Sequence, residues 1–399
     1  MPNGLALPTT LLGCILAAML SPVFATNVTV RCGDPSPPPG EYSTIAAALA
    51  ALSPEGPHTV TVDGLCREQV LIHDRRNLTL TGIDTSAAVE WFTNPVVDIK
   101  RSHSIIVFGL QISEASGVSV RPQLARAIYS SDVSFRMCRF VHGGGGVVAG
   151  IAAQVMVYNS TFDDLSGVAL VASDGGSLSA PGVTVRHSGR AAFADRNSNI
   201  WITAPFLAED ISGTAIATNS GIVRITSPNA TPAIIRRADL GILVNLRGEV
   251  RILAPVTVAD SRTNGVFIPG DGLLLVSPPG SLKVTGSVQN GIDVVAGGSI
   301  LLYNSDISAN GGHGVALERG ANAEVINSRI SGNLGSGIVV SHLSVLELTN
   351  STVTANPGKD LVCNTDSHAY GDSAGVGKMA CPGFSARSGP KPKPVDPED

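Results

Sequence analysis

An Asn-Ser pair recurs at a constant spacing in the C-terminal half of the chain. It begins at Asn304, Asn327 and Asn350, each 23 residues after the one before, and Gly314 and Gly337 keep the same step. The pairs follow short β-rich runs, and no helical period is found between Val70 and Val362. A fixed period in the twenties without helices is typical of a parallel β-helix, in which each repeat forms one coil.

Counting this repeat backward predicts a single all-β domain, a right-handed parallel β-helix of about 12 coils over residues 70–362. The coil lengths vary from 21 to 30 residues, which indicates loop insertions at one corner. The predicted coil starts are Asn77, His103, Val133, Gln154, Ser177, Asn199, Ile222, Glu249, Leu273, Ser299, Asn322 and Val345.

The repeating turn asparagines have a structural explanation. Asn tolerates the left-handed backbone conformation of a tight turn, and its amide can bond the equivalent Asn one coil away. We therefore expect an asparagine ladder at Asn304, Asn327 and Asn350. The same register predicts fully buried side chains in the following strands, at Val315, Leu317, Ile338 and Val340.

The two ends of the repeat carry different sequence. Residues 26–69 predict an N-terminal cap made of a strand, a helix over 44–52 capped by Ser43, and a second strand. Such a helix would cover the apolar end of the first coil. Residues 363–384 are predicted to form a C-terminal cap, and the Lys-Pro-rich residues 385–399 a disordered tail.

Residues 1–25 have the features of a signal peptide. Leu11–Leu20 is apolar, and Val23-Phe24-Ala25 offers small residues for cleavage, although no Lys or Arg precedes the apolar run. A lipoprotein modified at Cys14 is the alternative, but the apolar run continues past it and favours ordinary secretion. We expect a secreted or periplasmic protein without a membrane span after cleavage, since no later segment is long and apolar enough.

Export makes the five remaining cysteines interpretable as disulfide partners. Cys32 and Cys66 lie in the N-terminal block, and Cys363 and Cys381 in the C-terminal block. We predict one local disulfide at each end. Cys138 remains as a buried free thiol, because Phe135, Met137 and Phe140 surround it in the sequence.

Bulk composition excludes several classes of protein. A hydrophobic content of 43% excludes disorder for most of the chain. The net charge of −5 and the lack of a long basic run argue against a nucleic-acid partner. We expect a monomer.

One segment near the N-terminus carries a family resemblance. The run from Gly64 to Ile72, followed by Asn77-Leu78-Thr79-Leu80-Thr81-Gly82, resembles the first coil of the pectin-lyase-like β-helix superfamily. The resemblance extends over roughly residues 28–362. It implies the fold but no activity, because this superfamily contains lyases, hydrolases, epimerases, esterases, adhesins and inert scaffolds.

The resemblance also implies where a substrate would lie, on the outward face of one strand stack and its adjacent corner. The sequence places mostly apolar residues there, and the family's catalytic motifs are not found in order. His313 does lie between two glycines. The residues predicted to point outward are Ala169, Val171, Leu243, Phe267, Asp293, Ala316 and Val339.

One charged cluster follows the 23-residue step at the corner beside this face. Asp164, His187 and Asp210 are predicted to stack, with Asp163, Arg186 and Glu209 beside them. His187 could act as general base or acid and Arg186 could neutralise a uronate carboxylate, while the carboxylates orient them or hold Ca²⁺. A structural ion-pair ladder is the competing interpretation, and we favour it.

A second pair is Asp293 and Glu318, one coil apart and two residues displaced. Strand geometry places them about 8 Å apart, within the separation of the two carboxyl groups in inverting glycosidases. Two acids on an exposed face can meet this distance by chance.

These observations favour an exported surface scaffold or binding protein associated with carbohydrate, with a polysaccharide as the expected partner. The alternative is an acidic-polysaccharide lyase, epimerase or hydrolase acting near His187. The sequence predicts no cofactor, and Ca²⁺ is implied only under the lyase alternative.

Overall fold

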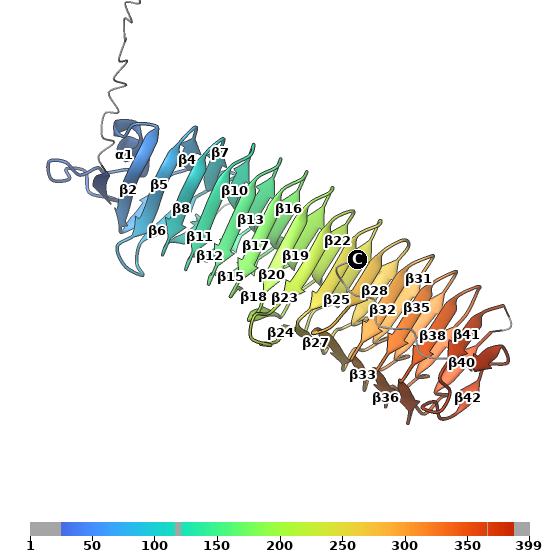
Figure 1. The fold of residues 1–399 in the computed structure, drawn as a ribbon. Coiled ribbons are helices and arrows are strands. Elements are labelled where there is room, and N and C mark those ends of the chain that lie inside the picture. Colours follow the sequence, from blue (N-terminus) through green and yellow to red (C-terminus); the bar gives the residue numbers. More distant parts are fainter. Residues whose placement is uncertain (1–24, 116–120, 365, 387–399) are drawn as a thin grey trace, which may run out of the picture.

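The computed structural model describes residues 25–115, 121–364 and 366–386. The predicted signal peptide up to Phe24, the alternative lipid site at Cys14 and most of the predicted tail lie outside the described residues. The described chain is almost entirely β-structure and forms an elongated parallel β-helix of about 14 turns (Figure 1).

Each turn contributes one strand to each of three parallel sheets, which we name A, B and C in the order in which the chain visits them. Sheet A has 16 strands. They are β1 (Thr26–Arg31), β2 (Glu55–Asp63), β5 (Arg76–Gly82), β8 (His103–Phe108), β11 (Asp132–Arg136), β14 (Gln154–Tyr158), β17 (Ser177–Pro181), β20 (Asn199–Thr203), β23 (Ile222–Thr226), β26 (Glu249–Leu253), β29 (Leu273–Val276), β32 (Ser299–Tyr303), β35 (Asn322–Ile326), β38 (Val345–Thr349), β41 (His368–Gly371) and β43 (Phe384–Ala386).

Sheet B has 13 strands. They are β3 (Leu65–Arg67), β6 (Ala88–Trp91), β9 (Gln111–Glu114), β12 (Arg139–Gly143), β15 (Thr161–Leu165), β18 (Thr184–Arg186), β21 (Phe206–Glu209), β24 (Ala233–Arg236), β27 (Pro255–Ala259), β30 (Ser281–Thr285), β33 (Asp306–Ser308), β36 (Arg329–Ser331) and β39 (Thr352–Thr354).

Sheet C has 14 strands. They are β4 (Val70–His73), β7 (Val97–Lys100), β10 (Gln123–Ile128), β13 (Gly145–Gly150), β16 (Val168–Ser173), β19 (Arg190–Asp195), β22 (Thr214–Asn219), β25 (Leu240–Asn245), β28 (Val266–Pro269), β31 (Ile292–Val295), β34 (Val315–Glu318), β37 (Ile338–Val340), β40 (Leu361–Cys363) and β42 (Met379–Ala380).

The predicted coil starts all fall within strands of sheet A, from β5 to β38. The stack has more coils than the sequence predicts because β1, β2, β41 and β43 also pair with this sheet. Strands β1, β2 and β41 lie in the segments assigned to the caps, where the Asn-Ser turn is missing. Strand β43 runs from the last residue of the predicted C-terminal cap into the first two residues of the segment predicted as a disordered tail.

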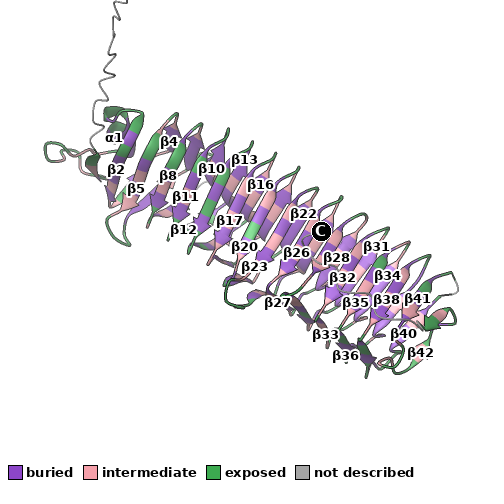
Figure 2. Ribbon diagram, in the orientation of Figure 1, coloured by how far each residue is buried: buried purple, intermediate pink, exposed green. Residues whose placement is uncertain are grey.

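Inward-facing residues alternate with outward-facing ones along most strands, as Figure 2 shows in purple and pink. This alternation fills the interior with rows of Val, Ile and Leu side chains. The predicted core residues Val315, Leu317, Ile338 and Val340 are fully buried, and they pair one coil apart. The predicted strand register is therefore confirmed.

The asparagine ladder forms at a different corner from the predicted one. Asn304, Asn327 and Asn350 do adopt left-handed φ angles of 48°, 48° and 49°. The buried ladder instead lies between sheets B and C, at Asn310, Asn333 and Asn356. There the Asn310 amide donates to Asn333 at 2.8 Å, and the Asn333 amide donates to Asn356 at 3.1 Å.

The N-terminal end is closed by helix α1 (Ile45–Ala51), which packs against the first coil (Figure 1). Its N-cap is Thr44 rather than the predicted Ser43, and the Thr44 hydroxyl accepts a hydrogen bond from the Ala47 amide. Glu68 also accepts hydrogen bonds from the first two helix amides, Ile45 and Ala46. Within the described ranges, α1 is too short to cross a bilayer and no longer apolar helix occurs.

Two disulfides join Cys32 to Cys66 and Cys363 to Cys381, one at each end of the stack, which confirms the predicted pairing. Cys138 is a buried free thiol, and burial raises its pKa to about 11. A thiol with this pKa is protonated and unreactive at neutral pH.

We therefore expect thiol labelling of the unfolded, unreduced mature protein to modify Cys138 alone. In the folded protein Cys138 should label only slowly, because it is buried. Mass spectrometry of tryptic peptides checks both results. A label on any of the four paired cysteines before reduction would contradict the assignment.

Candidate functional site

The charged cluster predicted from the sequence lies where strands of sheet B end. Asp163 on β15 pairs in register with Arg186 on β18, and Arg186 pairs with Glu209 on β21. The row continues to Arg236 on β24. The next position in each coil has a left-handed φ, at Asp164, His187, Asp210 and Arg237. We call these eight residues the charged corner.

His187 contacts Asp210, one of the two carboxylates predicted to flank it, and Asp163 from the neighbouring row. Its Nδ1 lies 2.8 Å from Asp163 and its Nε2 lies 3.8 Å from Asp210. Asp164 instead lies 2.8 Å from Nδ1 of His142, in the preceding coil. Within the predicted column of Asp164, His187 and Asp210, the structure therefore brings His187 and Asp210 together, while Asp164 contacts His142. Asp164 and His187 both lie at left-handed turns, where the side chains leave the row that the strand defines.

Glu209 is the centre of the cluster, with a side chain only 8% exposed. Arg186 lies 3.2 Å from it, Arg236 lies 2.5 Å from it, and Arg237 also contacts it. Burial alone would raise the pKa of Glu209, but Arg237 and Arg236 hold that pKa below its usual value. Glu209 is therefore ionised and neutralises part of the arginine charge.

Asp210 makes the second strong pair of the corner, with Arg237 Nε at 2.7 Å. This hydrogen bond lowers the pKa of Asp210. Sequence reasoning missed Arg236 and Arg237 because they follow Glu209 and Asp210 by 27 residues rather than 23. A loop insertion between β23 and β24 lengthens this coil, and allowing for it in the sequence would have placed the two arginines beside Glu209 and Asp210.

The arrangement favours a charged His187 over a catalytic base. The hydrogen bond to Asp163 raises the pKa of His187, with Asp210 adding to the effect. An imidazolium cannot abstract a proton. The four carboxylates are each paired with a His or Arg side chain, so they do not offer the uncompensated oxygen cluster that Ca²⁺ requires.

Substitution of His187 by Ala should lower stability only at acidic pH. A raised pKa in the folded state gives stability that is fully present below the unfolded pKa of about 6.5 and is lost as pH rises through the folded pKa. Because His187 is exposed, we expect a cost of under about 1 kcal/mol near pH 5.5 and none near pH 9. Thermal unfolding at both pH values checks this. In an Asp163→Asn background the pH dependence should shrink, and an unchanged dependence would contradict the pairing.

A second cluster lies on the outward face of sheet C. In register, the outward row runs through Val171, Phe193, Ala217, Leu243, Phe267, Asp293, Ala316 and Val339. Ala169, which the sequence predicted to face outward, is fully buried, and Ala316 is nearly so. Between Val171 and Val339, Asp293 on β31 is the one charged residue of this row, which continues in the N-terminal direction through Val148 to Arg126 and Asp98.

Amide side chains surround Asp293. Asn264 Nδ2 donates a hydrogen bond to the Asp293 carboxylate at 3.3 Å. The side-chain oxygen of Asn264 accepts a hydrogen bond from the Asn290 backbone amide. Asn290 in turn accepts from the His313 backbone at 2.8 Å, and His313 Nδ1 accepts from the Ser336 backbone at 2.9 Å. We call Asn264, Asn290, Asp293 and His313 the polar cluster.

Burial raises the pKa of Asp293, and the nearby negative charge of Glu318 raises it further. Glu318 lies opposite Val295 in register, two residues beyond Asp293, as the sequence predicted. Because one carboxyl holds its proton more tightly than usual, the pair could share acid and base roles.

Asp98 on β7 provides a contrast on the same face. Its buried carboxylate lies 2.7 Å from Lys100, 3.0 Å from Arg126 and 3.4 Å from His73. Burial opposes ionisation of Asp98, but hydrogen bonds from Arg126 and Lys100 leave its pKa lowered. Within the described residues, Asp293 has no comparable cation pair and depends on amide groups.

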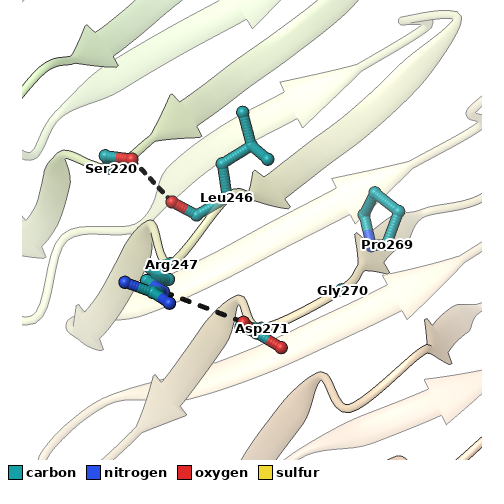
Figure 3. Close-up of a pocket in the computed structure, with 6 residues that line it drawn as sticks. All are labelled: Ser220, Leu246, Arg247, Pro269, Gly270 and Asp271. Carbon is teal, nitrogen blue, oxygen red and sulfur yellow. Dashed lines mark hydrogen bonds and ion pairs between the residues drawn. The ribbon is translucent and has the colours of Figure 1, made fainter.

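An open depression of about 490 Å³ lies at the corner between sheets C and A (Figure 3). Ser220 donates a hydrogen bond to the Leu246 carbonyl there, and Arg247 pairs with Asp271 at 3.8 Å. Turn backbone and an exposed Leu246 form most of its wall. These groups do not converge on a common point, as Figure 3 shows.

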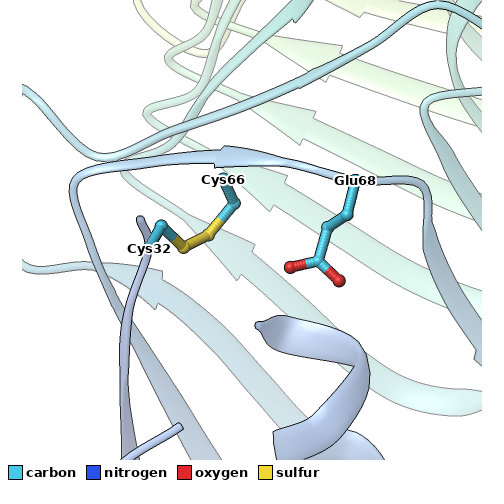
Figure 4. Close-up of side chains that lie close together, drawn as sticks. All are labelled: Cys32, Cys66 and Glu68. Carbon is cyan, nitrogen blue, oxygen red and sulfur yellow. A yellow bond between two sulfur atoms is a disulfide. The ribbon is translucent and has the colours of Figure 1, made fainter. Parts of the chain in front are cut away.

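In the described part of the chain, one group of side chains has the spacing of a metal site: Cys32, Cys66 and Glu68 (Figure 4). The two sulfurs are bonded to each other, and Glu68 accepts two helix amides. These atoms are therefore structural and unsuited to holding an ion.

The coil geometry and the outward strand faces define a class: the chain is a right-handed parallel β-helix protein. A family model described as "Right handed beta helix region" matches residues 237–373, which include the polar cluster. No curated protein matches the chain.

Several solved structures are similar to this chain. The A-module of Azotobacter vinelandii mannuronan C-5 epimerase AlgE4 is 12% identical over 87% of this chain and 94% of its own, with a TM-score of 0.49. The periplasmic alginate epimerase AlgG is 11% identical over 87% and 84%, with a TM-score of 0.46. The Siphovirus 9NA tailspike receptor binding domain is 10% identical over 93% and 78%, with a TM-score of 0.44. At these identities and TM-scores, the activities of these proteins are not assigned to this chain.

Proposed function

We propose that this chain is an exported β-helix protein that binds a carbohydrate chain on the outward face of sheet C, at the polar cluster and the neighbouring ring of Phe267. Two disulfides support a secreted or periplasmic location, since such bonds persist in oxidising compartments. The role is that of a binding protein or surface scaffold.

The observation that carries the proposal is the state of Asp293. A half-buried carboxyl that lacks a cation lowers stability, and such groups concentrate at functional sites. Asp98 shows how the same sheet compensates a carboxylate that has a structural role. Asp293 instead has carboxylate oxygens that can accept further hydrogen bonds from a ligand, and the neighbouring amide groups can also bond that ligand.

Phe267 supplies the apolar half of the site. It lies directly opposite Asp293 in register on the preceding strand, and its side chain is partly exposed. A sugar ring has a hydroxyl-bearing edge and an apolar C–H face, so a ring beside carboxyl and amide groups fits both. Ligand sites commonly combine an apolar wall with a few polar groups that fix orientation.

Binding should be measured by calorimetry against alginate, pectate and neutral glycans, with and without Ca²⁺. Phe267→Ala and Asn290→Ala should each weaken binding at least tenfold, while His187→Ala should leave it unchanged. No binding to any glycan would overturn the proposal. Loss of binding in His187→Ala with full binding in Phe267→Ala would move the site to the charged corner.

Catalysis at the same face is the second candidate function, favoured by the raised pKa of Asp293. Protonated Asp293 would donate a proton to the leaving oxygen of a glycosidic bond, and Glu318 would activate water. Turnover that Asp293→Asn and Glu318→Gln both abolish would support it. Turnover that depends on His187 would instead favour the alternative of a lyase, epimerase or hydrolase at the charged corner.

Asp293→Asn should also stabilise the fold at neutral pH, by up to about 1 kcal/mol, as single relieving substitutions commonly do. A carboxyl with a raised pKa binds its proton more tightly in the folded state, so its contribution to stability falls as pH rises through the folded pKa. The gain should vanish near pH 3, where both states are protonated. Denaturant unfolding at pH 3 and pH 7 measures the difference, and a destabilised variant at pH 7 would show that Asp293 is a structural ion.

A further inference from the structure

Sheet A, a different sheet from the one that carries Asp293, has exposed aromatic and methionine side chains on its outward face. Phe108 is 39% exposed, Met156 is 43%, Tyr158 is 44% and Trp201 is 39%. Met137, at the turn after β11, is 58% exposed. We call these five residues the aromatic strip.

The strand register places the strip along the axis of the stack. Phe108 on β8 lies opposite Arg136 on β11, which lies opposite Tyr158 on β14. Met156 on β14 lies opposite Ser179 on β17, which lies opposite Trp201 on β20. The three rings therefore occur on every second strand of sheet A, β8, β14 and β20. Successive rings are two inter-strand spacings apart along the axis, about 9.6 Å.

Arg136 lies between Phe108 and Tyr158, and the other positions around the rings are mostly small and uncharged. Ser134, Ser179, Pro181 and Thr203 face outward beside the rings on the intervening or same strands. The two outward rows that hold the rings have ten positions on these five described strands, and Arg136 is the one charged side chain among the ten. The Arg136 Nε donates to the Ser134 hydroxyl at 2.8 Å. The exposed Asp132 lies at the start of β11, outside these two rows. The strip therefore offers flat apolar faces with hydroxyl groups between them.

We propose that the aromatic strip is a second carbohydrate-binding surface, which takes a neutral, linear, β-1,4-linked glycan. In such a chain alternate sugar rings are turned over, so the same ring face recurs every two units. That repeat is close to two inter-strand spacings, and each aromatic ring on β8, β14 and β20 can stack on an equivalent sugar. Serine and threonine hydroxyls between the rings reach the sugar hydroxyls.

The dimensions of the strip favour a thin polymer over a protein partner. It spans four inter-strand spacings, about 19 Å, and two residues along each strand, about 7 Å. A stable protein interface buries about 800 Å² on each partner, several times this footprint. The scarcity of charge also favours a neutral glycan over a uronate polymer.

Tryptophan fluorescence provides the test, because the chain has two tryptophans and the other, Trp91, packs on Phe92 in sheet B. In a Trp91→Phe background, titration with cellohexaose or chitohexaose should give a saturable change in Trp201 emission. Tyr158→Ala should weaken binding at least fivefold, and Phe108→Ala combined with Tyr158→Ala should abolish it. Leu343→Ala, an exposed apolar side chain at a distant corner, should leave binding unchanged.

Phe267→Ala should also leave this binding unchanged, which separates the strip from the sheet C site. No saturable change with either hexamer, or equal affinity in Tyr158→Ala, would overturn the proposal. Tighter binding of a mannuronate hexamer would overturn the neutral specificity. A dimer in light scattering that Tyr158→Ala dissociates would show that a second copy covers the strip instead.

Discussion

Replacing Asn333 by Ala should lower the free energy of unfolding by about 3–5 kcal/mol, because several buried polar groups would lose their partners together. Asn333 is fully buried. Its Oδ1 accepts from both the backbone and the amide of Asn310, and its Nδ2 donates to the Ile307 carbonyl and to Asn356. Each unsatisfied buried group costs about 1–3 kcal/mol.

Asn327 in the same coil provides the matched control. It is a left-handed turn residue, and Gly adopts that conformation without strain. Asn327→Gly should therefore change stability by less than about 1 kcal/mol. Chemical denaturation of both variants measures the contrast. Equal losses would mean that the turn, rather than the buried amide, stabilises the corner.

Replacing Phe140 by Ala should cost about 3–5 kcal/mol, the range for deleting a buried aromatic ring. The Phe140 ring stacks on Phe162 of the next coil with centroids 4.6 Å apart and meets Phe135 edge-on at 5.6 Å. All three rings are essentially inaccessible to solvent. The cavity would lie between two coils, and a parallel stack cannot close it without shortening the strand spacing.

Phe108→Ala is the comparison, because Phe108 is an aromatic residue of the same solenoid that points outward. Its removal should cost less than about 1 kcal/mol. Thermal and denaturant unfolding should rank the two variants in this order. A Phe140→Ala protein as stable as Phe108→Ala would show that neighbouring coils relax into the space.

The repeat predicted the coils well because each coil in the middle of the stack must place a left-handed residue at the same corner. Asn304, Asn327 and Asn350 mark that position in the sequence. The end coils were missed since the segments that form them lack the Asn-Ser turn. The buried ladder was missed although Asn310, Asn333 and Asn356 keep the same 23-residue step. Spacing alone does not tell which of two asparagines in a coil points inward.

The charged corner was predicted as a set of rows but not as a set of bonds. Register fixed Asp163, Arg186 and Glu209 in one row. The left-handed backbone at His187 then turned its ring toward Asp163, which spacing does not reveal. The raised pKa of Asp293 could not be predicted from the sequence either. It depends on how far the carboxyl is buried and on which side chains of three neighbouring coils surround it.

Each disulfide holds an end coil of the stack: Cys32, just after β1, is bonded to Cys66 on β3, and Cys381, just after β42, is bonded to Cys363 on β40. In a one-dimensional stack these are the coils from which unfolding would otherwise spread. With the end coils covalently bonded, unfolding must begin at an interior coil. Each interior coil is stabilised by a neighbouring coil on both sides. Reducing conditions would therefore shorten the lifetime of the whole rod by releasing its ends, while every contact in the middle stayed intact.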